Sequence, residues 1–425
     1  MYPRNLCGSF WCKSGGRNVK IGYVTPEFIT EKNRGGQAAY LENISRIFSK
    51  HGHEVVIVVL SDHNEEFVWE DGITVCRVEF HEAMPADQVC SVKKIFHIFW
   101  AYAGVSLVLN RKTQKLIKDK KIEIAQYSSL RALPLFMSRR IPSVIRLSAH
   151  PVYCRYAQEE FFDISEAENN LSLSEKIWLF SLKRADFIFG PSKMVGSAVE
   201  RKIKKKVEII ESPLSSDLNV MDKHIYCRYL EGKKYMLFFG TLNYLKGIQT
   251  IAPILDEFLD KYKEMYFVFV GKDDFIPHNG KKISSKEYIL EFIEKHRDRV
   301  EFIDAIYEKA SLNYIVYKAE ACVLPSRMDN LPNTGIEAMA LGKIVIGTNG
   351  ASFEQLIDDG VSGYLCERDD PQSLLECMNK VMNMTEEQKE AMEYKAKLRT
   401  QEMDGENIYR QLMMIYEKTL QLWKK

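Results

Sequence analysis

The 425-residue sequence lacks the motifs that most directly assign a catalytic class. It has no Gly-x-Gly, so the usual dinucleotide fingerprint is missing, and no Gly-Lys-[Ser/Thr], which disfavours P-loop hydrolysis. Neither His-Glu-x-x-His nor the Gly-x-Ser-x-Gly elbow occurs. An Asp-x-Asp pair is also absent, which argues against a metal ion held by closely spaced carboxylates. We therefore expect neither a metal site nor a resident cofactor.

An excess of charge of one sign is lacking too. Lys and Arg number 59 against 58 Asp and Glu, and the net charge of +1 differs from the strong basic excess of nucleic-acid binders. The nine cysteines are odd in number and scattered, without a Cys-x-x-Cys, which disfavours a disulfide framework or a zinc ribbon. Free thiols in a reducing cytoplasm are the simpler interpretation. We expect a cytoplasmic protein without a nucleic-acid partner.

Long apolar runs are scarce. The longest, residues 95–109, is shorter than the ~20 residues that span a bilayer, and basic residues flank it on both sides. It fits a buried helix with solvated ends, or a helix that lies at a membrane interface near anionic lipid. Buried helices are the more common of the two. Residues 1–18 have no apolar core of the kind found in signal peptides, and we expect this segment to be loosely ordered.

The sequence does contain a nearly continuous alternation of short apolar runs and helical segments. This pattern predicts parallel sheets covered by helices on both faces. A hairpin that turns at Asp71-Gly72 is expected within residues 67–79. The predicted strands cover residues 19–24, 54–60, 122–127, 143–147, 186–190 and 207–210, and then residues 235–240, 266–271, 300–303, 321–325 and 344–347.

The alternation weakens once, between residues 213 and 234, where Pro213, Gly232 and several charges occur. Chain length also favours two domains. We therefore predict an α/β fold with two facing, doubly wound Rossmann-like domains at residues 19–212 and 235–403. Ligands of such sheets bind at the carboxyl ends of the strands, which predicts a site in the cleft between the domains.

The first candidate segment is residues 238–247, FFGTLNYLKG. It leaves a predicted strand, turns at Gly240 and presents Lys246 where the next helix begins. An ammonium group there can lie against a diphosphate. From this segment alone, a lysine in solvent at a helix start is the simpler interpretation.

The second segment is residues 324–348, LPSRMDNLPNTGIEAMALGKIVIGT. A predicted strand ends, a loop follows, and Asn333, Thr334 and Gly335 lead into a helix whose free N–H groups make an anion site. Glu337 can aim its carboxylate at ribose hydroxyls, or it merely complements the helix dipole. Asp329 lies in the loop, where it can accept hydrogen bonds from sugar hydroxyls.

These segments resemble the retaining glycosyltransferases of the GT-B fold, family 4 (glycosyl transferases group 1). The resemblance covers about residues 19–420 and is strongest at 238–247, 321–348 and 349–371. It implies a nucleotide-sugar donor, UDP- or GDP-linked, bound as a co-substrate mainly by the C-terminal domain. It also implies that a last helix, within residues 404–425, crosses back onto the N-terminal domain.

The resemblance also implies roles for individual residues. Lys246 matches the lysine that contacts the donor diphosphate. Asp329 and Glu337 match the two acids of the E-x7-E motif, expected at the transferred sugar and the ribose. His150 is expected near the transferred sugar, although a loop histidine without a role is almost as common. The remaining expected donor contacts are Gly35, Gly36, Gly240, Thr241, Asn333, Thr334 and Gly335.

Three positions depart from the family pattern. Thr241 stands where the family usually has Arg, which removes one guanidinium from the diphosphate site. Asp329 replaces Glu, which shortens the reach of this acid by one methylene. His150 comes slightly late after its strand. We interpret Asp329, with the flanking Asn-Leu-Pro-Asn, as the mark of a subtype.

The resulting prediction is metal-independent transfer of a hexosyl-type sugar, with retention, onto a glycan or lipid-linked glycan in bacterial surface polysaccharide or lipopolysaccharide assembly. Residues 201–206 (RKIKKK) and 95–109 suggest peripheral contact with the cytoplasmic face of the inner membrane, although RKIKKK also fits a solvated helix end. Two alternatives remain open. One is another GT-B enzyme, such as a nucleotide-sugar epimerase or a phosphorylase. The other is a catalytically inactive donor-binding or scaffold subunit.

Overall fold

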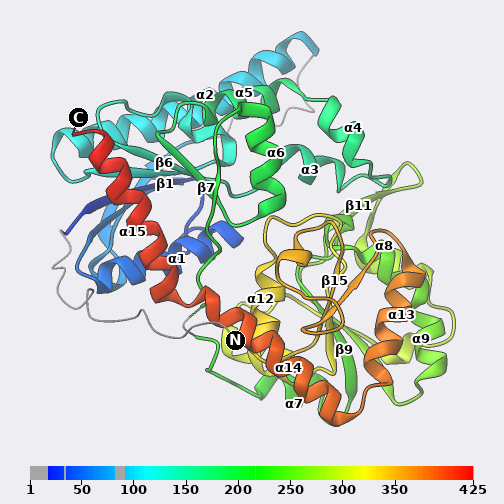
Figure 1. The fold of residues 1–425 in the computed structure, drawn as a ribbon. Helices are drawn as coiled ribbons and strands as arrows, with labels where there is room; N and C mark the ends of the chain where they lie inside the picture. The colour runs from blue at the N-terminus through cyan, green and yellow to red at the C-terminus, as the bar shows by residue number, and fades with distance from the viewer. Residues whose placement is uncertain (1–17, 33–34, 82–90, 216, 425) are drawn as a thin grey trace.

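The computed structural model describes residues 18–32, 35–81, 91–215 and 217–424, without the side chains of residues 91–101 and 167. It shows two α/β domains that lie against each other (Figure 1). Of the N-terminal segment that we expect to be loosely ordered, residues 1–17 lie outside the described residues.

The N-terminal domain is built on an eight-stranded sheet with the order β3-β4-β2-β1-β5-β6-β7-β8. All neighbours are parallel except β3 and β4, which form the predicted hairpin, with Asp71 and Gly72 at positive φ in its turn. Runs such as EVVIVVLS in β2 are apolar at successive positions because helices cover both faces of the sheet. The strands are β1 Lys20–Thr25, β2 Glu54–Ser61, β3 Glu65–Val68, β4 Thr74–Glu79, β5 Ile124–Ser128, β6 Ser143–Arg146, β7 Phe187–Gly190 and β8 Glu208–Ile209.

Helices cover this sheet, and the predicted apolar segment 95–109 forms part of the longest one, α2. Its described residues include Val105 and Leu109, which are buried in the domain core, as the buried-helix interpretation requires. None of the helices in the described residues is long and apolar enough to cross a membrane. The helices are α1 Gly36–Lys50, α2 Ser91–Lys118, α3 Pro151–Tyr156, α4 Ile164–Asn169, α5 Leu173–Leu182 and α6 Lys193–Ile203, with 3-10 turns at Glu70–Gly72 and Leu130–Phe136.

The C-terminal domain has a six-stranded parallel sheet with the order β13-β10-β9-β14-β15-β16. Its strands are β9 Lys234–Phe239, β10 Met265–Val270, β13 Val300–Ile303, β14 Ala321–Val323, β15 Val345–Thr348 and β16 Tyr364–Cys366. Its helices are α7 His224–Tyr229, α8 Ile248–Ile251, α9 Leu255–Lys261, α10 Ser285–Glu291, α11 Lys309–Lys318, α12 Asn333–Ala340, α13 Pro371–Met382 and α14 Glu386–Thr400. Two helix-covered sheets, parallel except at the β3–β4 hairpin, confirm the predicted fold class.

Two elements of this domain were not predicted. One is β16, only three residues long. The other is a separate hairpin of β11 (Phe275–His278) and β12 (Lys281–Ser284). Its turn contains Asn279-Gly280, both at positive φ, which is a standard hairpin signal. The signal was missed because polar residues surround the turn and hide the strand alternation.

The chain passes between the domains twice. Within residues 213–234, α7 packs against α11, and Leu230 is fully buried in the C-terminal core. At the other end, α14 lies on the C-terminal domain, whereas α15 (Gly405–Leu422) packs against α1 of the N-terminal domain (Figure 1). The Tyr416 hydroxyl of α15 donates to Gln126 Oε1 of β5 at 2.6 Å. The last helix is therefore part of the N-terminal core.

This docking predicts the effect of truncating α15 side chains. Leu412 is fully buried, so Leu412→Ala should lower the free energy of unfolding by about 2–5 kcal/mol through lost burial and a cavity. Met414 on the same helix is 63% exposed, and Met414→Ala should change it by less than about 0.5 kcal/mol. Urea denaturation compares the two variants. Equal, small effects would contradict the docking of α15.

Candidate functional site

The turn after β9 is held tightly against the loop after β14. The Asn243 side chain accepts a hydrogen bond from the backbone N–H of Lys246 and so caps the 3-10 turn Tyr244–Lys246. Gly247 follows with φ of 86°, and a Cβ built there would lie 1.9 Å from the carbonyl oxygen of Pro325. Only glycine fits this conformation and this contact. The approach fixes the position of Lys246 relative to the β14 loop.

Lys246 and Asp329, which were both predicted to lie in the site, are in direct contact. The Lys246 ammonium donates to Asp329 Oδ2, and the two side chains are 27% and 16% exposed. The backbone N–H of Arg327 also donates to the Leu245 carbonyl at 3.0 Å. The lysine is thus held in place by a carboxylate that balances its charge.

The predicted anion site at the start of α12 faces the predicted glycine loop of the other domain. The first backbone bond of α12 runs from the Ile336 N–H to the Pro332 carbonyl, so the N–H groups of Asn333, Thr334 and Gly335 precede the helical ladder. A Cβ on Gly36, at the start of α1, would lie 3.1 Å from Asn333 Nδ2. Two helix N-termini, each with a partial positive charge, therefore meet across the domain boundary.

A carboxylate lies at one of these N-termini. A Cβ on Gly35, the N-cap residue of α1, would be 3.4 Å from Glu27 Oε2. Burial raises the pKa of Glu27, while hydrogen bonds from the backbone N–H groups of Gly35 and Gln37 partly offset that rise. Sequence reasoning missed Glu27. Its only signal is its place directly after the end of β1.

Glu337 has a cationic neighbour that the sequence did not reveal. Lys309 Nζ lies 3.6 Å from Glu337 Oε1 and 3.1 Å from Ser215 Oγ. Burial raises the pKa of Glu337, and Lys309 partly offsets the rise. Glu337, Lys309 and Asn333 line a cavity of about 20 Å³ between α1 and α12, room for about one water molecule. A larger ligand enters this cavity only if the domains move apart.

His150 is buried among aromatic rings. Its ring stacks on Tyr153 at 4.0 Å and meets Trp178 edge to face at 5.3 Å, and its Nδ1 has no hydrogen-bond partner. It is the N-cap residue of α3. Cys154 lies further along α3. Burial is the main cause that raises the pKa of its thiol to about 11; the charge of Asp329 also raises this pKa, and the charge of Lys246 lowers it.

The N-terminal domain has a large pocket at the carboxyl ends of β1, β2 and β4. Its volume is about 600 Å³, and carboxylates and aromatic rings both line it, including Glu27, Glu31, Asp62, Phe80 and Tyr102. Such a mixture suits a ligand with hydroxyl groups and apolar faces.

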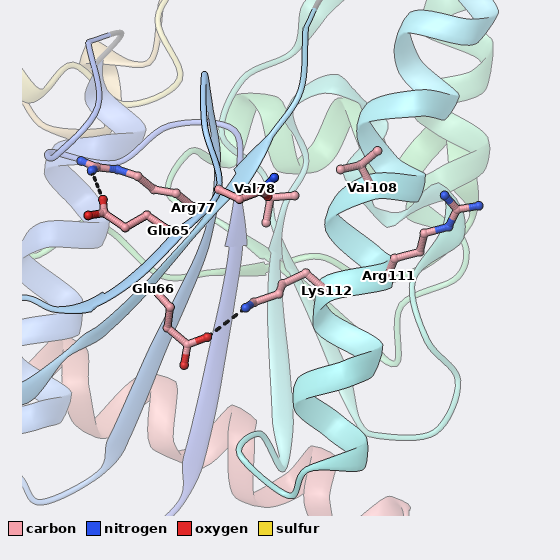
Figure 2. A pocket seen from close by; sticks show the side chains of 8 residues that line it. Glu65, Glu66, Arg77, Val78, Val108, Arg111 and Lys112 are labelled. Carbon is pink, nitrogen blue, oxygen red and sulfur yellow. Dashed lines mark hydrogen bonds and ion pairs between the residues drawn. The ribbon is translucent and has the colours of Figure 1, made fainter.

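A second pocket, of about 470 Å³, adjoins the first and lies between β4 and α2 (Figure 2). Arg77 lines both pockets. Figure 2 shows Lys112 of α2 pointing at Glu66 and Arg77 pointing at Glu65, each as an ion pair. Two cations that line this pocket, Arg77 and Lys112, are therefore paired with carboxylates of the same lining.

Gly240 and Thr241, two further predicted donor contacts, lie in the turn after β9. Gly240 follows β9, and a Cβ there would have no heavy atom within 4 Å. Thr241, the residue that departs from the family pattern, is partly buried. Within the described part of the chain, no group of three or more His, Cys, Asp or Glu side chains is placed to hold a metal ion.

Comparison with known proteins identifies the domain that carries these residues. Residues 228–399 match the family model of glycosyl transferases group 1. The match lies within the C-terminal domain and its flanking segments. The matched range contains the turn with Lys246 and both acids, so the resemblance drawn from the sequence is confirmed for this domain.

Similar proteins extend the likeness to the whole chain. Over 191 residues, which are 44% of this chain and half the length of that protein, the sequence is 24% identical to spore coat protein SA of Bacillus subtilis. Sucrose-phosphate synthase of Thermosynechococcus elongatus has a similar structure, with a TM-score of 0.72 at 15% identity over 95% of this chain and 99% of that one. Anabaena HepE, solved with UDP and glucose, gives 0.66 at 14% identity over 94% and 100%. The chain has the GT-B fold of these two structures.

The burial of His150 predicts a pH-dependent loss of stability. Burial lowers the pKa of His150 from 6.5 to about 4. The unfolded chain therefore binds more protons between these values, and stability is complete above pH 6.5 and falls as the pH drops towards 4, by about 3 kcal/mol in all. His150→Gln removes this component, so urea denaturation at pH 7, 6 and 5 should show a shallower decline than in the wild type. An unchanged slope would contradict the neutral, buried imidazole.

Proposed function

We propose that the chain transfers a sugar from a UDP- or GDP-linked donor to a glycan or lipid-linked glycan, with retention of anomeric configuration and without a metal ion. The observation that carries this proposal is the Lys246–Asp329 pair beside the start of α12, all within the matched family domain. A cation and free backbone N–H groups near one another are what a diphosphate needs.

Departure of the nucleoside diphosphate develops negative charge on the β-phosphate. Lys246 and the N–H groups of Thr334 and Gly335 stabilise that charge, and each contact is worth a few kcal/mol only because it is aimed before the reaction. Asp329 keeps the ammonium oriented and accepts from hydroxyls of the transferred sugar. Domain closure excludes water and favours transfer over hydrolysis.

Glu337 accepts hydrogen bonds from the ribose hydroxyls of the donor. Lys309, 3.6 Å away, favours the ionised form of this partly buried carboxylate, which is the form that accepts hydrogen bonds. Because the cavity beside them is small, the donor binds to an open form and the domains then close. The protein acts without a nucleophilic side chain of its own.

The acceptor binds in the 600 Å³ pocket of the N-terminal domain. Its carboxylates accept from sugar hydroxyls, and Phe80 and Tyr102 contact the apolar faces of the sugar. The adjoining pocket between β4 and α2 extends this surface for a longer acceptor (Figure 2). Surface polysaccharide assembly on the cytoplasmic face of a membrane fits this acceptor class.

Peripheral membrane contact has weaker support. Within RKIKKK, Arg201 pairs with Glu168 and Lys206 with Glu208, as expected of a helix end with local partners.

Thr241 favours one alternative, a donor-binding subunit without catalysis. It stands where the family pattern has an arginine, so the donor diphosphate has one cation fewer beside it. The donor-binding test below applies to both functions.

The proposal predicts which ligands protect the protein from unfolding. A UDP- or GDP-sugar at 100 times its dissociation constant should stabilise the wild type by ~2.7 kcal/mol. Lys246→Ala should abolish the shift, because the variant leaves the diphosphate without its main cation. A thermal-shift panel of UDP-, GDP- and ADP-sugars measures this.

Lys263→Ala is the matched control, since Lys263 is an exposed lysine of the same domain and should keep the full shift. If no nucleotide sugar or free nucleoside diphosphate protects the wild type, donor binding is refuted. If a donor protects the protein but no acceptor is glycosylated, the binding-subunit alternative is favoured.

A further inference from the structure

Arg327 crosses the boundary between the domains two residues before Asp329. It is only 4% exposed, and its guanidinium donates to three carbonyl oxygens of the N-terminal domain. These are Ala157 at 3.5 Å, Glu159 at 2.5 Å and Glu160 at 3.0 Å. All three carbonyls belong to residues 157–160, directly after α3, and we call this stretch the latch segment.

Within its own domain, Arg327 is braced on two sides. Nε donates to Asp369 Oδ1 at 2.7 Å, and the guanidinium lies 5.3 Å from the centre of the Tyr244 ring. A buried guanidinium is costly unless it is paired and hydrogen-bonded, and these contacts meet both conditions. Its planar fork matches several acceptors at once, which a lysine ammonium at the end of a flexible stem does not.

The latch segment leads back to the candidate site. It follows α3, whose Val152 and Tyr153 belong to the core cluster against which Leu245, the neighbour of Lys246, is packed. The neighbouring Met328 is packed into the core cluster of the N-terminal domain, and Asn330 Nδ2 donates to the Leu147 carbonyl at 3.1 Å. The loop that carries Asp329 thus contacts the opposite domain through three neighbouring residues.

The contacts of Arg327 with the latch segment exist only while the domains are together. On opening, the three carbonyls return to water, and Arg327 keeps only its contacts with Asp369 and Tyr244. The geometry points to Arg327 as a positioning residue that holds α3 and the latch segment against the loop that carries Asp329 in the closed state, which, on the proposed function, keeps water away during sugar transfer. Arg327 acts through α3 and does not touch the substrate.

The test compares Arg327→Lys with Arg299→Lys. Arg299 also donates to several backbone carbonyls, those of Leu259, Tyr262, Lys263 and Met265, but all of them lie in its own domain. Arg299→Lys therefore also removes a guanidinium that donates to backbone carbonyls, but it breaks no contact between the domains. Two quantities are measured, the radius of gyration of the ligand-free chain by X-ray scattering, and the ratio of sugar transfer to donor hydrolysis.

Arg327→Lys should expand the free chain and lower kcat for transfer by about ten- to a hundredfold, as expected for a misplaced site. It should also raise the share of donor lost to hydrolysis. Arg299→Lys should leave the radius of gyration and the transfer-to-hydrolysis ratio as in the wild type, whatever its effect on the melting temperature.

An unchanged radius of gyration together with an unchanged ratio in Arg327→Lys overturns the proposal. A loss in melting temperature with both quantities unchanged also overturns it, because a purely structural role predicts that result. If the wild type turns over no nucleotide sugar, the proposed function fails, and the scattering comparison alone still decides whether Arg327 closes the domains.

Discussion

The contact between Lys246 and Asp329 is the interaction on which the rest of the site depends. It ties the turn after β9 to the loop after β14, the two neighbouring strands at the centre of the C-terminal sheet. The backbone supports it, because Gly247 lies directly against the Pro325 carbonyl and the Arg327 N–H reaches Leu245. A lysine held this way has lost its side-chain freedom before any ligand arrives, which lowers the entropic cost of binding a diphosphate.

The second constraint is electrostatic and comes from the two facing helix N-termini. The start of α12, with N–H groups that precede its helical ladder, lies across the boundary from the start of α1, where a Cβ on Gly36 would be 3.1 Å from Asn333 Nδ2. Like partial charges repel unless an anion lies between or beside them. Glu27 meets part of this need at α1, and the phosphates of a donor would meet the rest. On this account, donor binding and domain closure favour each other.

The sequence predicted the parts of the site that are local in the chain. The strand–turn–helix order around Gly240 and the Asp329 to Glu337 spacing are local patterns, and the strands they follow lie close to where they were expected. Contacts between distant segments were not predictable. Nothing in the neighbourhood of Lys309 points to Glu337, and nothing near Arg327 points to the carbonyls after α3. The burial of His150 was equally unpredictable from its neighbours in the chain, because the ring it packs against, that of Trp178, is 28 positions away.

The most direct test of the central claim is a crystal structure of the chain with UDP or GDP bound. The account predicts a β-phosphate oxygen within hydrogen-bond distance of Lys246 Nζ and of the Thr334 or Gly335 N–H, and the ribose beside Glu337. A nucleotide bound elsewhere, or one that leaves Lys246 in contact with Asp329 alone, would contradict it.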